Sequence, residues 1–147
     1  MSIGIGLSLK SLASIIIVDA KKYRFDLPMT QEMTLGQHGE TLAADYLTAR
    51  GYIIRERNWH CRVGEIDLVA QKDTIWIFIE VKTRRQRDAA LASITPQKRE
   101  RLVSAVYAYL EANGLDEAQW RVDAIGVTVM GRDEAPQIEH VEDALDW

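Results

Sequence analysis

Two apolar runs dominate the middle of this chain, Gly64-Glu65-Ile66-Asp67-Leu68-Val69-Ala70 and Ile75-Trp76-Ile77-Phe78-Ile79-Glu80-Val81-Lys82. Both are typical of β-strands, and the second is apolar at both alternate positions, as in a strand covered on both faces. Asp67, Glu80 and Lys82 interrupt them. A charge at the end of a buried strand is costly unless it is paired or bound to a metal ion, so these residues are the first candidates for a functional site.

The capping residues around these runs predict two helices. The first is expected from Thr34, its N-cap, to Arg50, with Gly51 as the C-terminal stop. The second begins at Thr95 and ends at Asn113-Gly114.

Strands are expected at about 52–58 and 120–130, with a short edge strand at 138–141 and a tight turn around Lys72-Asp73 between the central pair. The order α-β-β-β-α-β(-β) predicts an α/β domain with a central mixed sheet flanked by helices.

Pairing the two runs as a hairpin puts Asp67 and Glu80 on one face in three alternative registers. A loop at 73–74 or 72–75 places Asp67 opposite Glu80, and a loop at 72–73 places it opposite Phe78, diagonal to Glu80. Two carboxylates about 5 Å apart repel by about 3 kcal/mol at an effective dielectric constant near 20. Mg²⁺ would make the pair favourable, and Lys82 beside it could position or deprotonate an attacking water. The set suits phosphodiester hydrolysis.

From the spacing alone, a salt bridge of Lys82 with Glu80 or Asp67 is favoured over a metal site. Three features shift the balance. Glu40 projects close to the buried stripe of the first helix, and Gln97 and Lys98 lie near the core face at the start of the second. The third feature is a cluster of basic residues near the acidic centre that could dock a phosphate backbone.

The charge of the chain is uneven. The net charge is −4, but residues 82–101 carry +5 and the remainder therefore −9. The bases of this segment are Lys82, Arg84, Arg85, Arg87, Lys98, Arg99 and Arg101. Arg84, Arg85, Arg87, Arg99 and Arg101 are the expected nucleic-acid contacts. The single cysteine, Cys61, suits a reducing cytoplasm, and the three histidines have no metal-ligand spacing; His38 and His60 are interpreted as structural or solvated.

Residues 1–32 are expected to be an extension, either disordered or an over-long translation start, with Met29 or Met33 as the true start. Its uninterrupted apolar run, 12–18, is too short to span a bilayer, which takes about 20 residues. The folded domain is expected at 33–147, with no membrane association.

Several short motifs together resemble the YraN-like family of uncharacterised bacterial proteins. They are Gly36-Gln37-His38-Gly39-Glu40, Arg57-Asn58-Trp59, Gly64-Glu65-Ile66-Asp67-Leu68, Phe78-Ile79-Glu80-Val81-Lys82-Thr83-Arg84, Thr95-Pro96-Gln97-Lys98 and Arg121-Val122-Asp123. That family is similar to the PD-(D/E)xK, or restriction-endonuclease-like, nucleases, near the Holliday-junction-resolvase-like branch. Ile66 stands in place of the proline of the superfamily's name, and Val122 where an aromatic residue is usual.

The resemblance implies a restriction-endonuclease-like core and a nuclease site that uses Mg²⁺, or Mn²⁺. Asp67 and Glu80 would be its metal ligands and Lys82 its catalytic lysine. Glu40 would be the acid from the first helix, and Gln97 or Lys98 the auxiliary polar group on the second.

The sequence thus predicts a cytoplasmic, metal-dependent nuclease acting on structured nucleic acid, with DNA as the expected partner. A resolvase-like role would favour a homodimer. Two alternatives stay open: a non-catalytic nucleic-acid-binding protein on the same scaffold, and a structural partner in a larger complex. Asp123, mid-strand among apolar residues, is weighed evenly between pairing with a base such as Arg121 or Lys98 and a role in the site.

Overall fold

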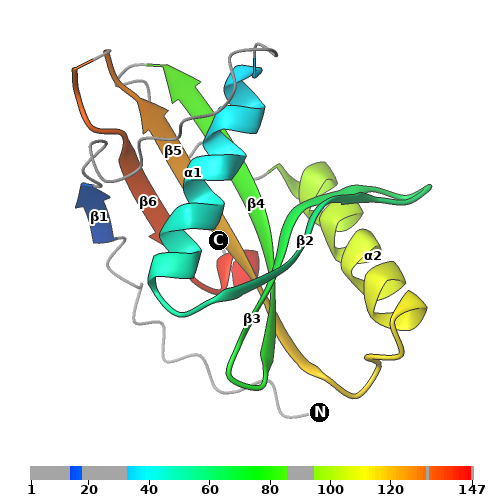
Figure 1. Cartoon of the computed structure of the whole chain (residues 1–147). Helices are drawn as coiled ribbons and strands as arrows, with labels where there is room; N and C mark the ends of the chain where they lie inside the picture. The colour runs from blue at the N-terminus through cyan, green and yellow to red at the C-terminus, as the bar shows by residue number, and fades with distance from the viewer. Residues whose placement is uncertain (1–13, 18–32, 86–94, 132, 147) are drawn as a thin grey trace.

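The fold is a mixed sheet with one helix on each face (Figure 1). A computed structural model of the chain describes residues 14–17, 33–85, 95–131 and 133–146. Six strands pair in the order β1-β6-β5-β4-β3-β2, and β4 and β5 are parallel while the other neighbours are antiparallel. The predicted α/β architecture and the order of its elements are confirmed.

The elements follow the predicted order, with one additional strand. The helices are α1 (Leu35–Ala49) and α2 (Pro96–Ala112), and a short 3-10 turn, η2, covers Ala144–Asp146. The strands are β1 (Ser14–Ile17), β2 (Ile53–His60), β3 (Glu65–Lys72), β4 (Ile75–Arg85), β5 (Gln119–Val129) and β6 (Gln137–Val141).

The helix boundaries are set by the predicted caps. Thr34 accepts a hydrogen bond from the Gln37 amide (3.2 Å) while the Gln37 side chain accepts from the Thr34 amide (2.9 Å), which is a capping box. Thr95 caps α2 by accepting from the amide of Lys98 (3.3 Å). Because each cap satisfies amides that the helix cannot, the helices begin where their sequences indicate.

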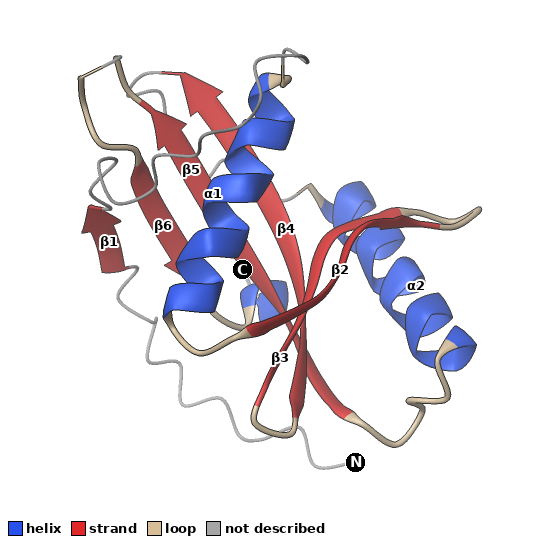
Figure 2. Cartoon of the chain, viewed as in Figure 1, coloured by secondary structure: helices blue, strands red, loops and turns tan. Residues whose placement is uncertain are grey.

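The expectation of an edge strand at 138–141 was wrong in its position within the sheet. β6 lies between β5 and β1, and β1 is the outermost strand on that side (Figure 2). β1 falls in the predicted N-terminal extension, whose other residues, 1–13 and 18–32, lie outside the described residues. The alternative translation start stays a prediction.

Each face of the sheet carries its own apolar core. α1 packs on one face with the side chains of Leu68, Ile77 and Ile79, and α2 packs on the other with Val69 and Phe78. These residues alternate along β3 and β4, as the pleat of a strand requires. Residues 80 and 82 of β4 therefore belong to the α2 face by the same alternation. On β3 the alternation ends at Leu68, because Ile66 packs in the α2 core.

The β2–β3 hairpin leaves the sheet and projects beside α2 (Figure 1). β3 pairs with β2 from residue 65 to 71, but with β4 only from residue 68 to 72. An irregularity between Ile54 and Glu56 bends β2, as a bulge does. The sheet therefore forks at Asp67.

Within the described residues, no helix is both long and apolar enough to cross a membrane.

Candidate active site

Asp67 and Glu80 face one another at the fork between β3 and β4. Lys72 pairs with Ile75, so the turn is Asp73-Thr74, one residue later than the predicted centre. In this register the last ladder pair is Leu68 with Ile79, and the next position brings Asp67 opposite Glu80. Of the three registers considered from the sequence, the structure adopts one that places the two carboxyls directly across from each other.

The carboxylate of Asp67 completes the hydrogen bonding of the forked sheet. Its Oδ2 accepts the backbone amide of Val81 at 2.7 Å. Since β3 has left β4 at this point, no strand carbonyl of β3 remains to take that amide. The fork therefore holds the Asp67 side chain against β4, next to Glu80.

Burial raises the pKa of both carboxyls. Burial, followed by the charge of Glu80, raises the pKa of Asp67 to about 8, and the charges of Glu40 and Glu65 add to the rise. Burial also raises the pKa of Glu80, although Lys98, a hydrogen bond with Asp67 and Lys82 oppose it. At neutral pH the pair therefore holds a proton unless a cation takes its place.

Two lysines lie close to this acidic pair. Burial lowers the pKa of Lys82, and the positive charge of Lys98 lowers it further, while Glu80 opposes the shift. Lys98, in the first turn of α2, acts electrostatically on both Glu80 and Lys82. β4 and α2 thus bring to the carboxylates the two bases that the sequence proposed for this site.

Glu40 reaches the fork from the opposite side of the sheet because α1 approaches β4 very closely. A Cβ on Gly39 would lie 1.7 Å from Thr83 Oγ1, so only glycine permits this helix position. Glu40, the next residue, is partly buried and acts on Asp67 through its charge. The predicted convergence of Glu40 with Asp67 is present in the structure.

The α2 side of the site opens into a hollow of about 500 Å³ between the hairpin tip and α2. Glu80, Glu65 and Lys98 line it, and Asp67 is not among its lining residues. Gly64 keeps the hairpin against the helix, since a Cβ there would lie 2.6 Å from the backbone oxygen of Arg101. The hollow is therefore a built feature of the contact between hairpin and helix.

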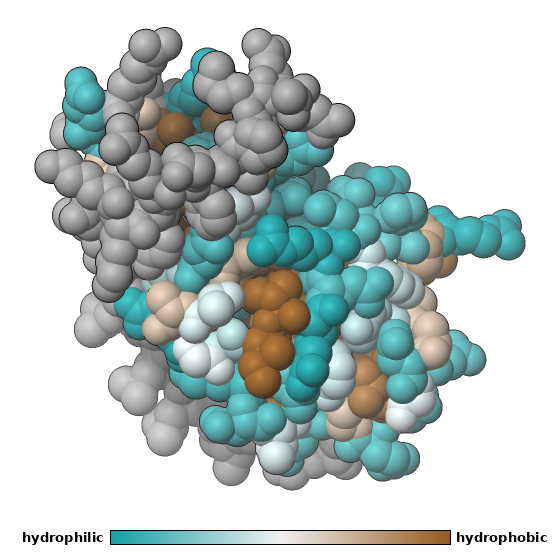
Figure 3. Space-filling view, in the orientation of Figure 1, coloured by the Kyte–Doolittle hydropathy of each residue, from teal (hydrophilic) through white to brown (hydrophobic). Residues whose placement is uncertain are grey.

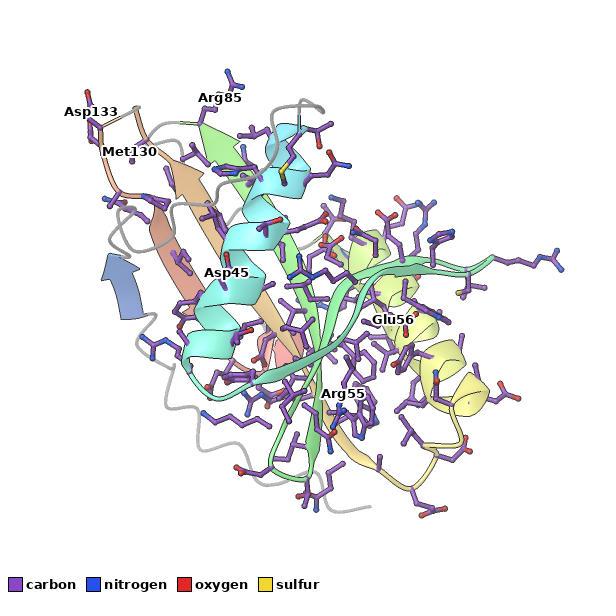
Figure 4. The ribbon with its side chains drawn as sticks, in the orientation of Figure 1. Asp45, Arg55, Glu56, Arg85, Met130 and Asp133 are labelled. Atoms are coloured by element: carbon purple, nitrogen blue, oxygen red, sulfur yellow. The ribbon has the colours of Figure 1, made fainter. Side chains whose placement is uncertain are left out.

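Other predicted site residues fall in different places. Gln97 is exposed and is not among the residues that line the hollow. Arg84, Arg85 and Arg101 are exposed, and Arg99 is partly buried. Of these bases Arg101 lines the hollow, whereas Arg85 extends outward at the far end of β4 (Figure 4). Arg87 lies outside the described residues.

Asp123 is held away from the site, in a buried ion pair. Its carboxylate accepts from Arg121 Nε (2.9 Å), from the Asp143 amide (3.0 Å) and from His140 Nε2 (2.8 Å). Its place in the alternation of β5 is the α1 face, with Ile125 and Val127, opposite to Glu80. The alternative of pairing with Arg121 is confirmed, and pairing with Lys98 is not observed.

Glu65 is the residue of this region that the sequence reasoning missed. Its charge raises the pKa of both Asp67 and Glu80, and its side chain lines the hollow. The sequence could have indicated Glu65, because it lies two residues before Asp67 and residues two apart on a strand share a face. His60 also lines the hollow, although the sequence indicated only a structural or solvated role.

A divalent cation fits this donor set by its chemistry. Asp67 and Glu80 are two oxygen donors that repel each other, and Mg²⁺ is commonly bound through one or two carboxylates while it keeps several waters. In the described part of the chain, no group of three or more His, Cys, Asp or Glu side chains is placed to hold a metal ion. The site therefore fits an ion held by two carboxylates and water better than one in an all-protein cage.

Comparison with known proteins finds a large set of sequences related to this chain. Residues 39–127 match the model of the family described as Uncharacterised protein family UPF0102. A UPF0102 protein of Roseiflexus castenholzii is 44% identical over 115 residues, which are 76% of this chain and 93% of the relative. One from Chloroflexus aurantiacus is 47% identical over 103 residues, 69% of this chain and 85% of the relative.

Among solved structures, the chain is similar to Pyrococcus furiosus SfsA in complex with Ca²⁺. The TM-score is 0.40 and the identity 14%, over 79% of this chain and 74% of that one. A likeness at this level is too distant to extend a ligand or an activity from one protein to the other.

Proposed function

The chain belongs to the uncharacterised protein family UPF0102, and we propose that it is a cytoplasmic, metal-dependent nuclease that hydrolyses phosphodiester bonds in structured DNA. The observation that carries the proposal is the facing pair Asp67 and Glu80, with the pKa of both carboxyls raised and two lysines beside them. This combination suits a cation and a phosphate together. The carboxylates supply ligands for the cation, and the lysines supply charge for the phosphate.

Asp67 and Glu80 would hold Mg²⁺ or Mn²⁺ directly. Such an ion, when bound, polarises a phosphoryl oxygen and lowers the pKa of a coordinated water. Glu40 and Glu65 add negative charge around the two ligands, which strengthens attraction for a cation. A purely structural salt bridge would not need four acids to converge on one fork.

Lys82 is suited to hold or accept a proton in this reaction. Because the pKa of Lys82 is lowered, a larger fraction of this side chain is the neutral amine at physiological pH than in an exposed lysine. Lys98, beside Glu80 and in the wall of the hollow, is placed to offset the negative charge of a phosphate. In this proposal Lys82 of β4 transfers the proton, and Lys98 of α2 offsets the charge of the phosphate.

The test separates metal binding from cleavage. Calorimetric titration of Mg²⁺ or Mn²⁺ should show binding to the wild type, no binding to Asp67→Ala or Glu80→Ala, and retained binding to Lys82→Ala. Cleavage of branched and linear DNA should be lost in all three variants. Asp73→Asn is the matched control, since Asp73 is an exposed acid in the β3–β4 turn with φ 54°, which asparagine also tolerates.

Equal metal affinity in the wild type and both acid variants would end the proposal of a metal site. DNA binding without cleavage by the wild type, in Mg²⁺ and in Mn²⁺, would instead support the non-catalytic nucleic-acid-binding alternative. Loss of binding in Lys82→Ala would assign that lysine to the structure of the site rather than to the reaction.

A further inference from the structure

The hollow between the β2–β3 hairpin and α2 is lined by several basic side chains, which a site made of two carboxylates does not by itself require. Four side chains that can be cationic line it together with Glu65 and Glu80: His60, Arg62, Lys98 and Arg101. We propose that this hollow receives one unpaired nucleotide, so that the substrate is a strand that is single-stranded at the cleaved bond. The inference rests on the proposed nuclease function and specifies its substrate.

The charges of the hollow match those of a nucleotide backbone beside a metal-binding acid. Arg62 and Arg101 come from the hairpin tip and from α2, so they can hold phosphate from two sides. Glu80 belongs both to this wall and to the acidic pair. A phosphate held in the hollow therefore lies next to Glu80, one of the two proposed metal ligands.

The size of the hollow selects a single nucleotide over a duplex. Its volume of about 500 Å³ lies in the range of small-molecule pockets, about 300–1,000 Å³. Glu80 is partly buried, and the walls are a hairpin and a helix whose backbones touch at Gly64. Because a hollow of this volume has room for one nucleotide, we expect the strand to be cut to leave the duplex first, as in enzymes that extrude a base.

The walls also provide surfaces for an unpaired base. The imidazole ring of His60 and the guanidinium planes of Arg62 and Arg101 are groups on which bases stack. Val63, at the hairpin tip, is 51% exposed and adds an apolar contact. Hydrophilic residues prevail on the visible part of the hairpin and α2, with a few apolar residues between them (Figure 3). A basic groove with side chains on which bases can stack is the arrangement that single-strand binding requires.

The experiment compares three labelled DNAs: a blunt duplex, the same duplex with a single-stranded tail, and the tail strand alone. Binding is measured by fluorescence anisotropy with Mg²⁺ in the Lys82→Ala background, and cleavage in the wild-type background. The tailed duplex and the single strand should bind about tenfold more tightly than the blunt duplex, which is the effect of about one stacked base. Cleavage should fall in the tail or at its junction.

The double variant Arg62→Ala/Arg101→Ala should remove this preference. The matched control is Arg50→Ala/Arg55→Ala, which removes the same charge outside the hollow: Arg50 stacks on Tyr46, and Arg55 hydrogen-bonds Gln71 on β3 (Figure 4). The control should keep the ratio of affinities, even if both affinities fall through the lost charge.

The outcomes distinguish the substrate inference from the nuclease proposal. If the blunt duplex is bound and cut as well as the tailed one, the inference is overturned while the nuclease function stands. If no DNA is cut by the wild type in Mg²⁺ or Mn²⁺, the nuclease proposal fails, and the binding ratio still decides the role of the hollow. A preference that survives in Arg62→Ala/Arg101→Ala also overturns the inference.

Discussion

The proton shared by Asp67 and Glu80 makes this pair a source of pH-dependent stability. In the unfolded chain the Asp67 carboxyl ionises near its ordinary value of 3.8, whereas in the folded protein its pKa is about 8. Between these values the folded state binds the extra proton, so the free energy of unfolding falls as pH rises through this window. The site is thus destabilising for the metal-free protein at neutral pH and above.

We expect metal-free wild type to lose thermal stability from about pH 4 to about pH 8 more steeply than Asp67→Asn, because asparagine cannot ionise. Melting temperatures in a chelating buffer series measure the difference between the two proteins. Asp73→Asn should follow the wild-type curve. Parallel curves for the wild type and Asp67→Asn would contradict the raised pKa.

Metal binding at this residue pair should release a proton near pH 7. The raised pKa of Asp67 means that a cation must displace the proton that the pair holds, so the affinity for Mg²⁺ should increase with pH up to about 8. Calorimetry in two buffers with different ionisation enthalpies reads the number of protons released. Identical heats in both buffers would show that the carboxyls are already ionised.

At the scale of elements, the close packing of α1 on β4 brings Glu40 to the fork. Gly39 faces Thr83 with no room for a Cβ, whereas a Cβ on Gly36 would lie 4.0 Å from its nearest neighbour, Thr34 Oγ1. In the same helix, therefore, Gly39 cannot be replaced without a shift of its neighbours, whereas Gly36 has room for a larger side chain.

Gly39→Ala should push α1 from β4, destabilise the protein by about 1–3 kcal/mol and weaken Mg²⁺ binding as Glu40 moves. Gly36→Ala should be neutral or stabilising by up to about 1 kcal/mol, because alanine favours the helix. Chemical denaturation and metal titration of both variants measure these effects. Equal stability of the two variants would mean that the helix adapts without loss.

At the scale of the whole molecule, the buried ion pair of Asp123 ties the end of the chain to the sheet on the face opposite the site. His140 contacts Asp123 through Nε2 and Tyr46 through Nδ1, at 2.8 and 3.3 Å. Burial opposes the ionisation of Asp123, but hydrogen bonds from His140 and Arg121 outweigh it and hold its pKa below the usual value. This contribution to stability is present above the unfolded pKa and is lost as pH falls through the folded one.

Asp123→Asn should destabilise the protein by about 3–5 kcal/mol, since it leaves part of a buried charged network unpaired. The loss should be largest near neutral pH and shrink in acid. Affinity for Mg²⁺ should not change, because Glu80 lies on the other face. Denaturation at several pH values and a metal titration test both parts, and a weakened metal affinity would contradict the separation of the two sites.

How much of the molecule was predictable depends on the range of the interactions involved. Local patterns predicted both helices with their caps, the central strands within three residues and the shared face of Asp67 and Glu80. Side-chain alternation and helix capping depend only on residues that are near one another in the chain, so they can be predicted from a single sequence. The additional strand β1 and the inner place of β6 were missed, because strand pairing between residues so far apart leaves little local trace.

The sequence by itself determined that two acids and a lysine would share one face of neighbouring strands. Only the tertiary structure decided which residues surround them. Glu40 lies near Asp67 because Gly39 lets α1 pack closely against Thr83 of β4. Lys98 lies near Glu80 because α2 packs on the face of the sheet that carries Glu80. The tertiary structure also decided the fork that buries Asp67, the hollow beside Glu80 and the exclusion of Asp123 from the site. These features depend on contacts between elements distant in the chain, and periodicity and spacing do not encode such contacts.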